Sequence, residues 1–388
     1  MKVAIIAPSH IPARRANTLQ VMKMAQAIAG LGHAVHLIAP MSEGSLDPRG
    51  ISWEDISRHY GLHTRFELEW LPAKRLLRRY DFGYRAVSWA RRWGADLIYT
   101  RLPQAGAFAS QLGAPAILEV HDLPQGALGT WLFKAFLAGR GARRLVVITH
   151  SLLNSLGQRF AAPLDPPFTL VEADGVDLWR YANLPETSLA RLLLRDKLNR
   201  PLDASCFVAG YTGHLYPGRG MELILEIAKR LPAVVFLLAG GEPQDVQRVE
   251  AQIRQINLRN VILTGFVPNA ELPLYQAACD VLLMPYQQRV AASSGGDIAP
   301  YLSPMKLFEY LACGRAILSS DLPVLREVLS PDCAMLLPPD EAGIWEKTIS
   351  DLKDHPEKRS RLGEQARKKA VHYTWEARAG RILEGLAV

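Results

Sequence analysis

The sequence predicts an α/β protein of two domains, each a mostly parallel sheet with helices on both faces. Three observations support this fold class. Short apolar runs alternate with helical patterns along the chain, as is typical of parallel sheets built from βαβ units. The alternation gives way to a turn-rich stretch at 160–204 and then restarts. The length of 388 residues has room for two domains of ordinary size.

The first domain is expected to begin with a strand at the start of the chain. The opening apolar run is short and its arginines follow it, whereas a secretory signal has its basic residues first and a longer apolar core. Later apolar runs and helical patterns predict the remaining elements. We expect strands at 3–7, 35–39, 97–99, 116–120 and 145–148, and helices notably at 17–31 and 82–93.

The second domain is expected to repeat this arrangement. Its predicted strands are 207–211, 234–239, 261–264, 281–284 and 316–319, and its predicted helices are 221–230, 244–255, 271–278, 304–313 and the segments after 340. We place the domains at 1–175 and 176–365, with a terminal helix at 366–388 that packs back toward the first domain. Ligands of such domains bind outside the carboxyl ends of the strands, and a cleft between two domains is the expected site.

Composition restricts the class of protein. No stretch approaches eighteen consecutive apolar residues, so no membrane-spanning helix is predicted. The cysteines Cys206, Cys279, Cys313 and Cys333 are widely spaced, without a CxxC pair or a Cys/His cluster. We expect them to be core residues of a cytoplasmic protein.

The positive charge is concentrated in the first half of the chain. Up to position 175 there are 20 Lys and Arg against 13 Asp and Glu, and the remainder has 25 of each. Many of these bases alternate with aromatic and apolar residues in the segment 65–92. The segment suits either a solvated helix face or a peripheral contact with an anionic membrane. Nucleic acid is not expected, because no recognised nucleic-acid module is present.

The stretch 303–321 has the features of an anion site at a helix start. Pro304 suits the first helical turn, and Ser303 can cap it. Free N–H groups and the positive dipole end attract anions there. The carboxylate of Glu309, further along the helix, could accept two hydroxyl hydrogen bonds. A sugar nucleotide contains both an anion, its diphosphate, and a diol, its ribose, so this stretch could bind one. The alternative is an ordinary helix with an exposed glutamate.

A glycine-rich turn follows the first strand of the second domain, at 211–220. Its glycines let a phosphate approach the backbone, and His214 and Arg219 could supply positive charge. Such a turn alone is weak evidence, because many α/β proteins contain one. The dinucleotide fingerprint GxGxxG is absent after the first strand of the chain, which argues against NAD-type domains.

Three segments resemble family 4 glycosyltransferases of the GT-B fold: GYTGHLYPGRGMELILEIAKRLPAVVFLLAGGEP, VILTGFVPNAELPLYQAACDVLLMPY and SPMKLFEYLACGRAILSSDLPVLREVL. They have the order and spacing of that family's nucleotide-sugar domain. KVAIIAPSH, ANTLQVMKMAQAIAGLGHAVHLI, LEVHDLP, ADGVDLWRY and YTWEARAGRIL extend the resemblance more loosely to nearly the whole chain. The resemblance implies two Rossmann-like domains facing across a cleft. It also implies a retaining enzyme that moves a hexose from a nucleotide-diphosphate sugar to an acceptor hydroxyl.

The resemblance also implies the roles of particular residues. Glu309 matches the second glutamate of the family's E-x7-E signature, which binds the nucleotide ribose. His121 matches the acceptor-side histidine close to the reacting sugar, although a structural histidine at a strand end is the alternative. The expected donor-binding residues are Gly213, His214, Arg219, Gly265, Phe266, Val267, Asp297, Tyr301, Ser303, Pro304, Met305, Lys306 and Glu309. The expected acceptor-side residues are Arg14, Arg15, Asn17, His121 and Asp122, and the expected catalytic residues are His121, Arg219 and Lys306.

The chain departs from the family pattern in three places. Tyr301 stands where the first signature glutamate is expected, so sugar contacts must differ and could use Asp297 or the backbone near 295–296. His214 and Arg219 replace the usual Arg and Lys pair, so the charge at 214 depends on protonation. The segment 14–17 replaces the usual glycine pair, which predicts altered acceptor contacts.

No metal cofactor is expected, because the sequence contains no DxD triplet and no evident carboxylate cluster. Charge on the departing diphosphate would be stabilised by Arg219, Lys306, His214 and the helix start. No residue stands out as a covalent nucleophile, and we expect front-face attack in which a diphosphate oxygen takes the acceptor's proton. Two alternatives stay open: a nucleotide-sugar-binding protein without transfer activity, and a GT-B epimerase that acts on the nucleotide sugar itself.

The partners expected from these features are a nucleotide-sugar donor and a glycan, lipid-linked or phosphorylated acceptor. An acceptor of that kind fits the synthesis of a cell-envelope polysaccharide or glycoconjugate. The basic segment 65–92, where it is not simply a solvated helix face, would make peripheral contact with the inner face of the membrane. Neither the donor sugar and base nor the acceptor follows from the sequence.

Overall fold

The computed structural model describes residues 1–42, 48–77, 79–160, 164–198, 200, 202–291 and 296–386. The chain divides into two compact units. The first unit combines Met1–Asp174 with Trp375–Val388, and the second is Gly175–Thr374. The expected boundary at 365/366 lies inside α13 (Pro356–Ala370), a helix of the second unit. The division between Thr374 and Trp375 leaves this helix whole.

The first unit is built on a parallel sheet with the strand order β3-β2-β1-β4-β5-β6-β7. The middle strands are apolar and buried on both faces, as expected of a covered parallel sheet. The strands are β1 (Lys2–Ile6), β2 (Ala34–Ser42), β3 (Glu67–Ala73), β4 (Leu97–Thr100), β5 (Ala116–Val120), β6 (Ala142–Val147) and β7 (Thr169–Val171).

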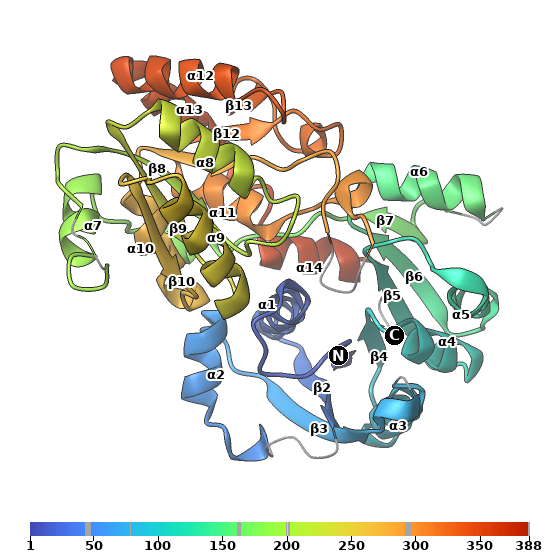
Figure 1. Ribbon diagram of the computed structural model, residues 1–388. Coiled ribbons are helices and arrows are strands. Elements are labelled where there is room, and N and C mark those ends of the chain that lie inside the picture. Colours follow the sequence, from blue (N-terminus) through green and yellow to red (C-terminus); the bar gives the residue numbers. More distant parts are fainter. Residues whose placement is uncertain are drawn as a thin grey trace. The chain divides into compact units, whose positions relative to one another are not determined.

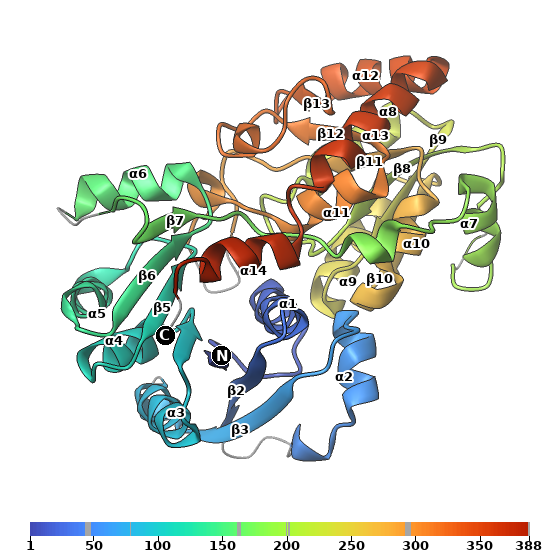
Figure 2. The same cartoon turned by 180° about the vertical axis from the view of Figure 1, so that it is seen from behind.

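Helices cover both faces of this sheet (Figures 1 and 2). On one face α1 (Ala16–Gly30) packs against α14 (Trp375–Leu383). On the other face α3 (Tyr80–Trp93), α4 (Pro103–Gln111) and α5 (Gly126–Ala138) lie side by side. The remaining helical segments are η1 (Pro48–Gly50), α2 (Trp53–Tyr60), η2 (Arg75–Leu77) and α6 (His150–Arg159).

The second unit has its own parallel sheet, with the strand order β10-β9-β8-β11-β12-β13. Because the strands are parallel, their carboxyl ends form a single edge. The strands are β8 (Phe207–Thr212), β9 (Val234–Ala239), β10 (Val261–Gly265), β11 (Val281–Met284), β12 (Ala316–Ser320) and β13 (Ala334–Leu337).

Helices again form two layers around this sheet. On one face α8 (Met221–Arg230) packs against α12 (Ala342–Asp354), whose Trp345 is fully buried. On the other face α11 (Met305–Cys313) contacts both α10 (Leu272–Ala277) and α13. The other helical segments are η3 (Leu178–Tyr181), α7 (Thr187–Leu193), α9 (Pro243–Gln255), η4 (Asn269–Glu271), η5 (Ala299–Tyr301) and η6 (Leu325–Glu327).

The α/β fold class is confirmed, and the expected strands and helices are present with small shifts at their ends. The strands β3, β7 and β13 were not expected, and the turn-rich stretch at 160–204 contains β7, η3 and α7. One capping prediction was wrong. Helix α11 begins at Met305 with Pro304 in the N-cap position, so Ser303 lies one residue too early to cap it. Over the described residues, every helix is too short or too polar to cross a membrane.

Candidate functional site

The carboxyl-end edge of the second unit's sheet brings together the turn after β8 and the start of α11. Two glycines make this close approach feasible. A Cβ on Gly213 would lie 3.0 Å from Lys306 Nζ, and a Cβ on Gly240 would lie 2.2 Å from the carbonyl oxygen of Gly213. Both residues have positive φ angles, 129° and 131°, which side chains disfavour. The glycine-rich turn therefore lies directly against the amine of Lys306.

Lys306 carries its amine into an aromatic surrounding. Its Nζ atom is buried and has no hydrogen-bond partner among the described residues. It lies 3.6 Å from the ring centroid of Tyr211 and 5.3 Å from that of Tyr286. Cation–π attraction offsets part of the lost hydration, but three N–H donors remain without an acceptor. An anionic ligand would supply the missing acceptors.

Arg219 brings a second positive charge to the same place. Its Nη1 donates a hydrogen bond to Tyr286 Oη at 3.0 Å, and its guanidinium lies 5.1 Å from that ring's centroid. Its Nε atom is buried without a partner in the described part of the chain. Two cations with unused donors next to a helix start form an anion-binding arrangement.

The charge of Arg219 acts against a positive charge on Lys306. Burial, followed by the positive charge of Arg219, lowers the pKa of Lys306 well below its ordinary value, and the carboxylate of Glu309 opposes this shift only in part. A negatively charged group beside Lys306 and Arg219 would attract both side chains, and it would raise the pKa of Lys306 toward its ammonium form.

His214 is neutral at this site near physiological pH. Its ring stacks on that of Tyr216 with the centroids 4.7 Å apart. Burial, together with the charges of Arg219 and Lys306, lowers the pKa of His214 to about 4. Its expected contribution of charge therefore requires strongly acidic conditions, and near neutrality it can offer a hydrogen bond only.

Glu309 belongs to a buried polar network. Its carboxylate accepts hydrogen bonds from Asn269 Nδ2 at 3.2 Å and Gln276 Nε2 at 3.5 Å, and lies 3.8 Å from Arg180 Nη1. Arg180 also donates to the backbone carbonyl of Asn269. These partners fix the position of the carboxylate, while its two oxygens retain lone pairs for a ligand's hydroxyls.

The residues around the missing signature glutamate have structural roles. The Oδ1 atom of Asp297 accepts hydrogen bonds at 2.9 Å from the backbone N–H groups of Val290 and Ala299, which ties the loop together. Tyr301 ends the short helix η5 and is half-buried. Of the two glycines whose backbone was expected to contact the sugar, Gly295 lies outside the described residues and Gly296 is exposed.

The turn at the end of β10 has open space beside its backbone. A Cβ added to Gly265 would meet no atom within 4 Å, and Val267, two residues further on, is buried. Phe266 is half-buried. The Gly265 carbonyl accepts a hydrogen bond from Gly240 N at 2.8 Å, so this turn belongs to the same edge as the glycine-rich turn.

The first unit places His121 at the carboxyl end of β5, within a buried cluster of charges. The His121 Nε2 atom is hydrogen-bonded to Glu119. Glu119 also accepts from Gln20 Nε2 at 2.7 Å and from Arg378 Nη1 at 3.2 Å. Arg378 comes from α14, and its side chain is 1% exposed. His121 keeps 19% of its side chain exposed, so Glu119 holds the ring while one part of it stays accessible.

The surroundings of His121 disfavour the charged form of its ring. Burial, followed by the charge of Arg101, lowers the pKa of His121 well below its ordinary value, although Asp174 opposes this. Burial also lowers the pKa of Arg101 to about 10. A neutral histidine next to a carboxylate donates its Nε2 proton to that carboxylate, which fixes the ring's tautomer.

Within the described residues, Glu119, His121 and Asp174 have ligand atoms within 4.8 Å of one another. They fit a metal ion poorly, because Arg378 Nη2 lies 3.1 Å from Glu119 Oε1 and the charge of Arg101 also acts on this cluster. A divalent cation would have to displace the contact between Arg378 and Glu119, and the positive charges of Arg378 and Arg101 would repel it.

The other acceptor-side residues lie in two loops of the first unit. Arg14 and Arg15 are exposed just before α1, with Arg15 as its N-cap residue. The Oδ1 atom of Asn17 is buried without a hydrogen-bond partner among the residues described. Asp122 accepts a hydrogen bond from Leu123 N at 2.7 Å, and burial raises the pKa of its carboxyl group.

Several residues of these sites did not follow from the sequence. Tyr211 and Tyr286 surround the amine of Lys306, and Arg180, Asn269 and Gln276 hold Glu309. Arg378 was part of the expected closing helix, but nothing in that helix pattern indicated its contact with Glu119. These pairs are far apart in the sequence, so only the fold brings them together.

Two family models match the chain, one in each unit. The model described as Glycosyltransferase Family 4 matches residues 19–167, and the model described as Glycosyl transferases group 1 matches residues 195–369. The first range contains His121, and the second contains Arg219, Lys306 and Glu309.

Relatives of known sequence match most of the chain at low identity. A D-inositol 3-phosphate glycosyltransferase of Kineococcus radiotolerans (strain ATCC BAA-149 / DSM 14245 / SRS30216) is 25% identical over 84% of this chain and 71% of its own. A phosphatidyl-myo-inositol mannosyltransferase of Mycolicibacterium smegmatis (strain ATCC 700084 / mc(2)155) is 21% identical over 99% of this chain and 92% of its own. A relative from Bacillus subtilis (strain 168) is 30% identical, but the match spans only 29% of it.

Solved structures share the fold. HepE of Anabaena, in complex with UDP and glucose, superposes with a TM-score of 0.74 over 100% of this chain and 99% of its own, at 19% identity. Sucrose-phosphate synthase from Thermosynechococcus elongatus gives a TM-score of 0.72 over 98% and 96%, at 20% identity. These similarities show the fold, two Rossmann-like domains.

Proposed function

We propose that this chain, which belongs to the family 4 glycosyltransferases, transfers a hexose from a nucleotide-diphosphate sugar to an acceptor hydroxyl. The transfer retains the configuration of the anomeric carbon and uses no metal ion. One observation carries the donor site. The buried amine of Lys306 has no hydrogen-bond partner in the described structure and lies with Arg219 beside a glycine-rich turn and a helix start. A diphosphate supplies the negative charge and the acceptor oxygens that these groups lack.

The rest of the donor fits around this anion site. The network that holds Glu309 presents a fixed carboxylate further along α11, suited to the two hydroxyls of a ribose. The space beside Gly265 suits the base. Tyr301 near the sugar provides a phenol in place of a carboxylate, which changes the hydrogen bonds that the sugar's hydroxyls can make.

The chemical step that we propose is a front-face transfer. The bond between the sugar's anomeric carbon and the diphosphate oxygen breaks while a bond to the acceptor oxygen forms on the same face. The acceptor's proton passes to an oxygen of the departing diphosphate, so no covalent intermediate is needed. Lys306 and Arg219 stabilise the negative charge that develops on the diphosphate. His121, held by Glu119, positions the reacting sugar as a neutral hydrogen-bonding group.

The acceptor we propose is a lipid-linked or phosphorylated sugar or polyol of cell-envelope synthesis. The names of two relatives include phosphatidyl-myo-inositol and D-inositol 3-phosphate, and Arg14 and Arg15 are exposed at the acceptor side. The basic segment 65–92 would hold the protein against the inner face of an anionic membrane, leaving aside Arg78 and the side chain of Arg75, which lie outside what the structure describes.

The donor site is tested by replacing Lys306 with methionine and measuring nucleotide binding by calorimetry. Loss of a charge-assisted contact of about 2 kcal/mol should weaken binding of a nucleoside diphosphate roughly thirtyfold, while binding of the nucleoside without phosphates should change little. Lys229→Met, at an exposed position on α8 of the same unit, is the matched control. Equal losses for nucleoside and nucleoside diphosphate would contradict a diphosphate contact.

Turnover separates the remaining possibilities. Incubation of UDP-, GDP- and ADP-sugars with candidate acceptors should give a product whose anomeric configuration, read by NMR, matches the donor's, and a metal chelator should leave the rate unchanged. An inverted product would overturn the proposed step. Conversion of the donor without an acceptor would identify an epimerase, and tight binding without any turnover would identify a binding protein.

A further inference from the structure

Helix α5 is apolar on the side that faces solvent. Its inner side buries Leu132, Phe133 and Phe136. Its outer side leaves Trp131 59% exposed and Leu128 52% exposed. Lys134 is its only charged residue. A surface helix of a soluble protein is normally polar on this side, so exposed apolar residues at helical spacing indicate an interaction surface.

A groove continues this apolar surface onto α4. It has a volume of about 390 Å³ and lies between the two helices. Trp131, Ala135 and Ala138 of α5 line one wall, and Ala107 and Phe108 of α4 line the other. Small and aromatic side chains form the walls, and Lys134 provides a positive charge at the same groove.

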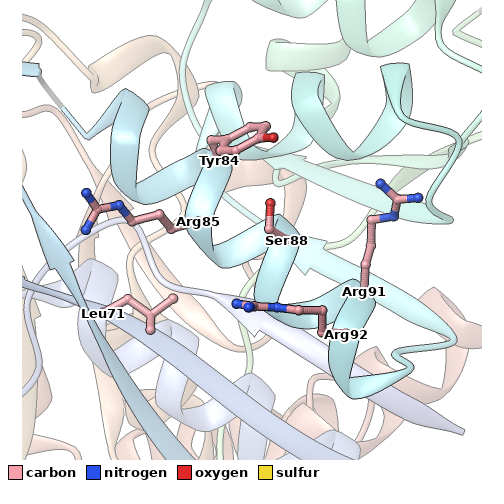
Figure 3. Close-up of a pocket in the computed structure, with 6 residues that line it drawn as sticks. All are labelled: Leu71, Tyr84, Arg85, Ser88, Arg91 and Arg92. Atoms are coloured by element: carbon pink, nitrogen blue, oxygen red, sulfur yellow. The ribbon is translucent and has the colours of Figure 1, made fainter.

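A second groove lies between α3 and β3, and it is strongly basic. Its volume is about 650 Å³, and its lining includes Arg85, Arg91 and Arg92 with Ser88 and Tyr84. Figure 3 shows Arg85 and Arg92 extended in the same direction from one face of α3, with Ser88 between them. In the described part of the chain none of these arginines has an ion-pair partner. Their exposed charges are available to an external anion.

The two grooves belong to one continuous surface. Tyr84 of α3 contacts Phe108 of α4 edge to face, with the ring centroids 6.0 Å apart. The helices α3, α4 and α5 lie side by side (Figures 1 and 2). Acidic residues are missing from α4 and α5, and α3 contains one, Asp81, which accepts a hydrogen bond from Lys74 N. Strand β3, the other wall of the basic groove, carries Glu67 and Glu69. The surface formed by the three helices is therefore positive and apolar at once, with these two glutamates at the edge strand beside it.

We propose that this surface, the α3–α5 face, docks on an anionic lipid bilayer. The α3–α5 face is defined by Tyr84, Arg85, Arg92, Leu128, Trp131 and Lys134. Its arginines bind lipid phosphates in the basic groove, and Trp131 and Leu128 enter the boundary between headgroups and acyl chains. Tryptophan and tyrosine favour this boundary because one part of each ring is apolar and one part is polar. The basic residues add electrostatic attraction to anionic lipids.

The position of α5 relates the docking surface to the acceptor side. Helix α5 begins at Gly126, directly after the strand end that carries His121 and Asp122. A bilayer against Leu128 and Trp131 would therefore lie near the acceptor-side residues of the same unit, where a lipid-linked acceptor has its headgroup. This last step rests on the proposed function, whereas the docking itself requires neither donor nor acceptor.

Vesicle sedimentation of the full chain tests the docking directly. The vesicles are pure phosphatidylcholine, or equal parts of phosphatidylcholine and phosphatidylglycerol. We expect binding to the anionic vesicles that weakens with added salt and is absent from the neutral ones. Arg85→Gln with Arg92→Gln should lower the partition coefficient about 25-fold, at about fivefold for each lost charge. Trp131→Ala should lower it roughly tenfold through lost apolar burial.

Matched variants separate docking from general effects of charge and apolar area. Arg361→Gln with Lys368→Gln removes two exposed bases from α13, and Leu192→Ala removes an exposed leucine from α7. Both should leave the partition coefficient unchanged. Circular dichroism melting checks that every variant is folded, which is expected because all of these side chains are exposed.

Three outcomes would overturn the proposal. They are equal binding to neutral vesicles, equal losses in the test and control variants, and no vesicle binding at all. Concentration-dependent self-association that Trp131→Ala abolishes would assign the face to a second copy of the chain instead. Binding of soluble polyphosphate that requires the arginines, without any vesicle binding, would assign the basic groove to a soluble polyanion. Each result leaves the donor-binding and transfer experiments unaffected, so the two proposals fail separately.

Discussion

Lys306 holds its amine in a buried space that offers no hydrogen-bond acceptor within the described structure. Burying a charged group without a partner is costly, and the usual response is a shift of its pKa toward the neutral form. The pKa of Lys306 is lowered well below its ordinary value by burial and then by Arg219. The residue is therefore prepared to gain a proton when an anion arrives.

We expect nucleoside diphosphate binding to take up a proton at Lys306. The bound anion favours the ammonium and raises the pKa of Lys306 from its lowered value. At a pH between the two values the complex binds more protons than the free protein, so affinity falls as pH rises, by at most about tenfold per pH unit. Calorimetry in buffers of different ionisation enthalpy counts the protons.

Two variants assign the proton. Lys306→Met should abolish the uptake, while His214→Gln should leave it unchanged near neutrality, because the pKa of His214 is lowered to about 4 by burial and by the charges of Arg219 and Lys306. If proton uptake persisted in Lys306→Met, another group would be responsible.

At the scale of residues, the sequence predicts the charged groups of the donor site but not what surrounds them. Lys306 and Glu309 could be identified because they occupy fixed positions after a recognisable helix start. Arg180 and Asn269 could not, since each meets Glu309 across a long separation in the chain. The contact between the Tyr211 ring and the Lys306 amine also depends on tertiary structure, because the two residues are far apart in the sequence. Burial lowers the pKa values of both His214 and Lys306, and it requires the fold.

At the scale of elements, two arginines hold α14 to the rest of the first unit. Arg378 donates to the carbonyl oxygens of Ala173 at 2.8 Å and Glu172 at 3.1 Å, besides its contacts with Glu119. Arg381 forms a two-point pair with the Glu172 carboxylate, with both distances 2.8 Å, but its side chain is 45% exposed. The two arginines lie on one helix and differ mainly in burial.

This difference predicts unequal costs. Arg378→Met leaves Glu119 with an uncompensated buried charge and should lower the free energy of unfolding by about 3–5 kcal/mol. Arg381→Met removes a partly exposed pair and should cost about 1 kcal/mol or less. Denaturant titration measures both. Hydrogen exchange should show lost protection in β5 and α14 for Arg378→Met. Equal costs for the two variants would mean that burial does not control this contact.

The sequence predicts most elements of this fold because their patterns are local. The strands β3 and β7 were missed for physical reasons. β3 is half-exposed along much of its length and carries glutamates, and β7 is only three residues long, within a turn-rich stretch. The start of α11 was placed slightly early, because Pro304 is compatible with both the N-cap position and the first turn.

At the scale of the molecule, a nucleoside diphosphate, which lacks the sugar and should bind only the second unit, should stabilise that unit selectively. A ligand at 100 times its Kd adds about 2.7 kcal/mol to the free energy of unfolding. We expect UDP, GDP or ADP, whichever matches the base site, to raise the melting temperature. Hydrogen exchange should slow in the turn after β8 and at the start of α11. Protection confined to β5 and α14 would contradict this placement, and Lys306→Met should lose the effect.

The first unit is made from two separated stretches of chain, and this has a consequence for its synthesis. The ribosome delivers the whole of Gly175–Thr374 between β7 and α14, which takes about 10–40 s at ordinary elongation rates. During that interval Glu119 lacks Arg378, and Arg144 lacks the carbonyl of Ile382 to which it donates. The second unit is continuous and can finish folding first. The unit that is started first is therefore the last to be completed, and newly made chains should depend most on chaperones while α14 is still missing.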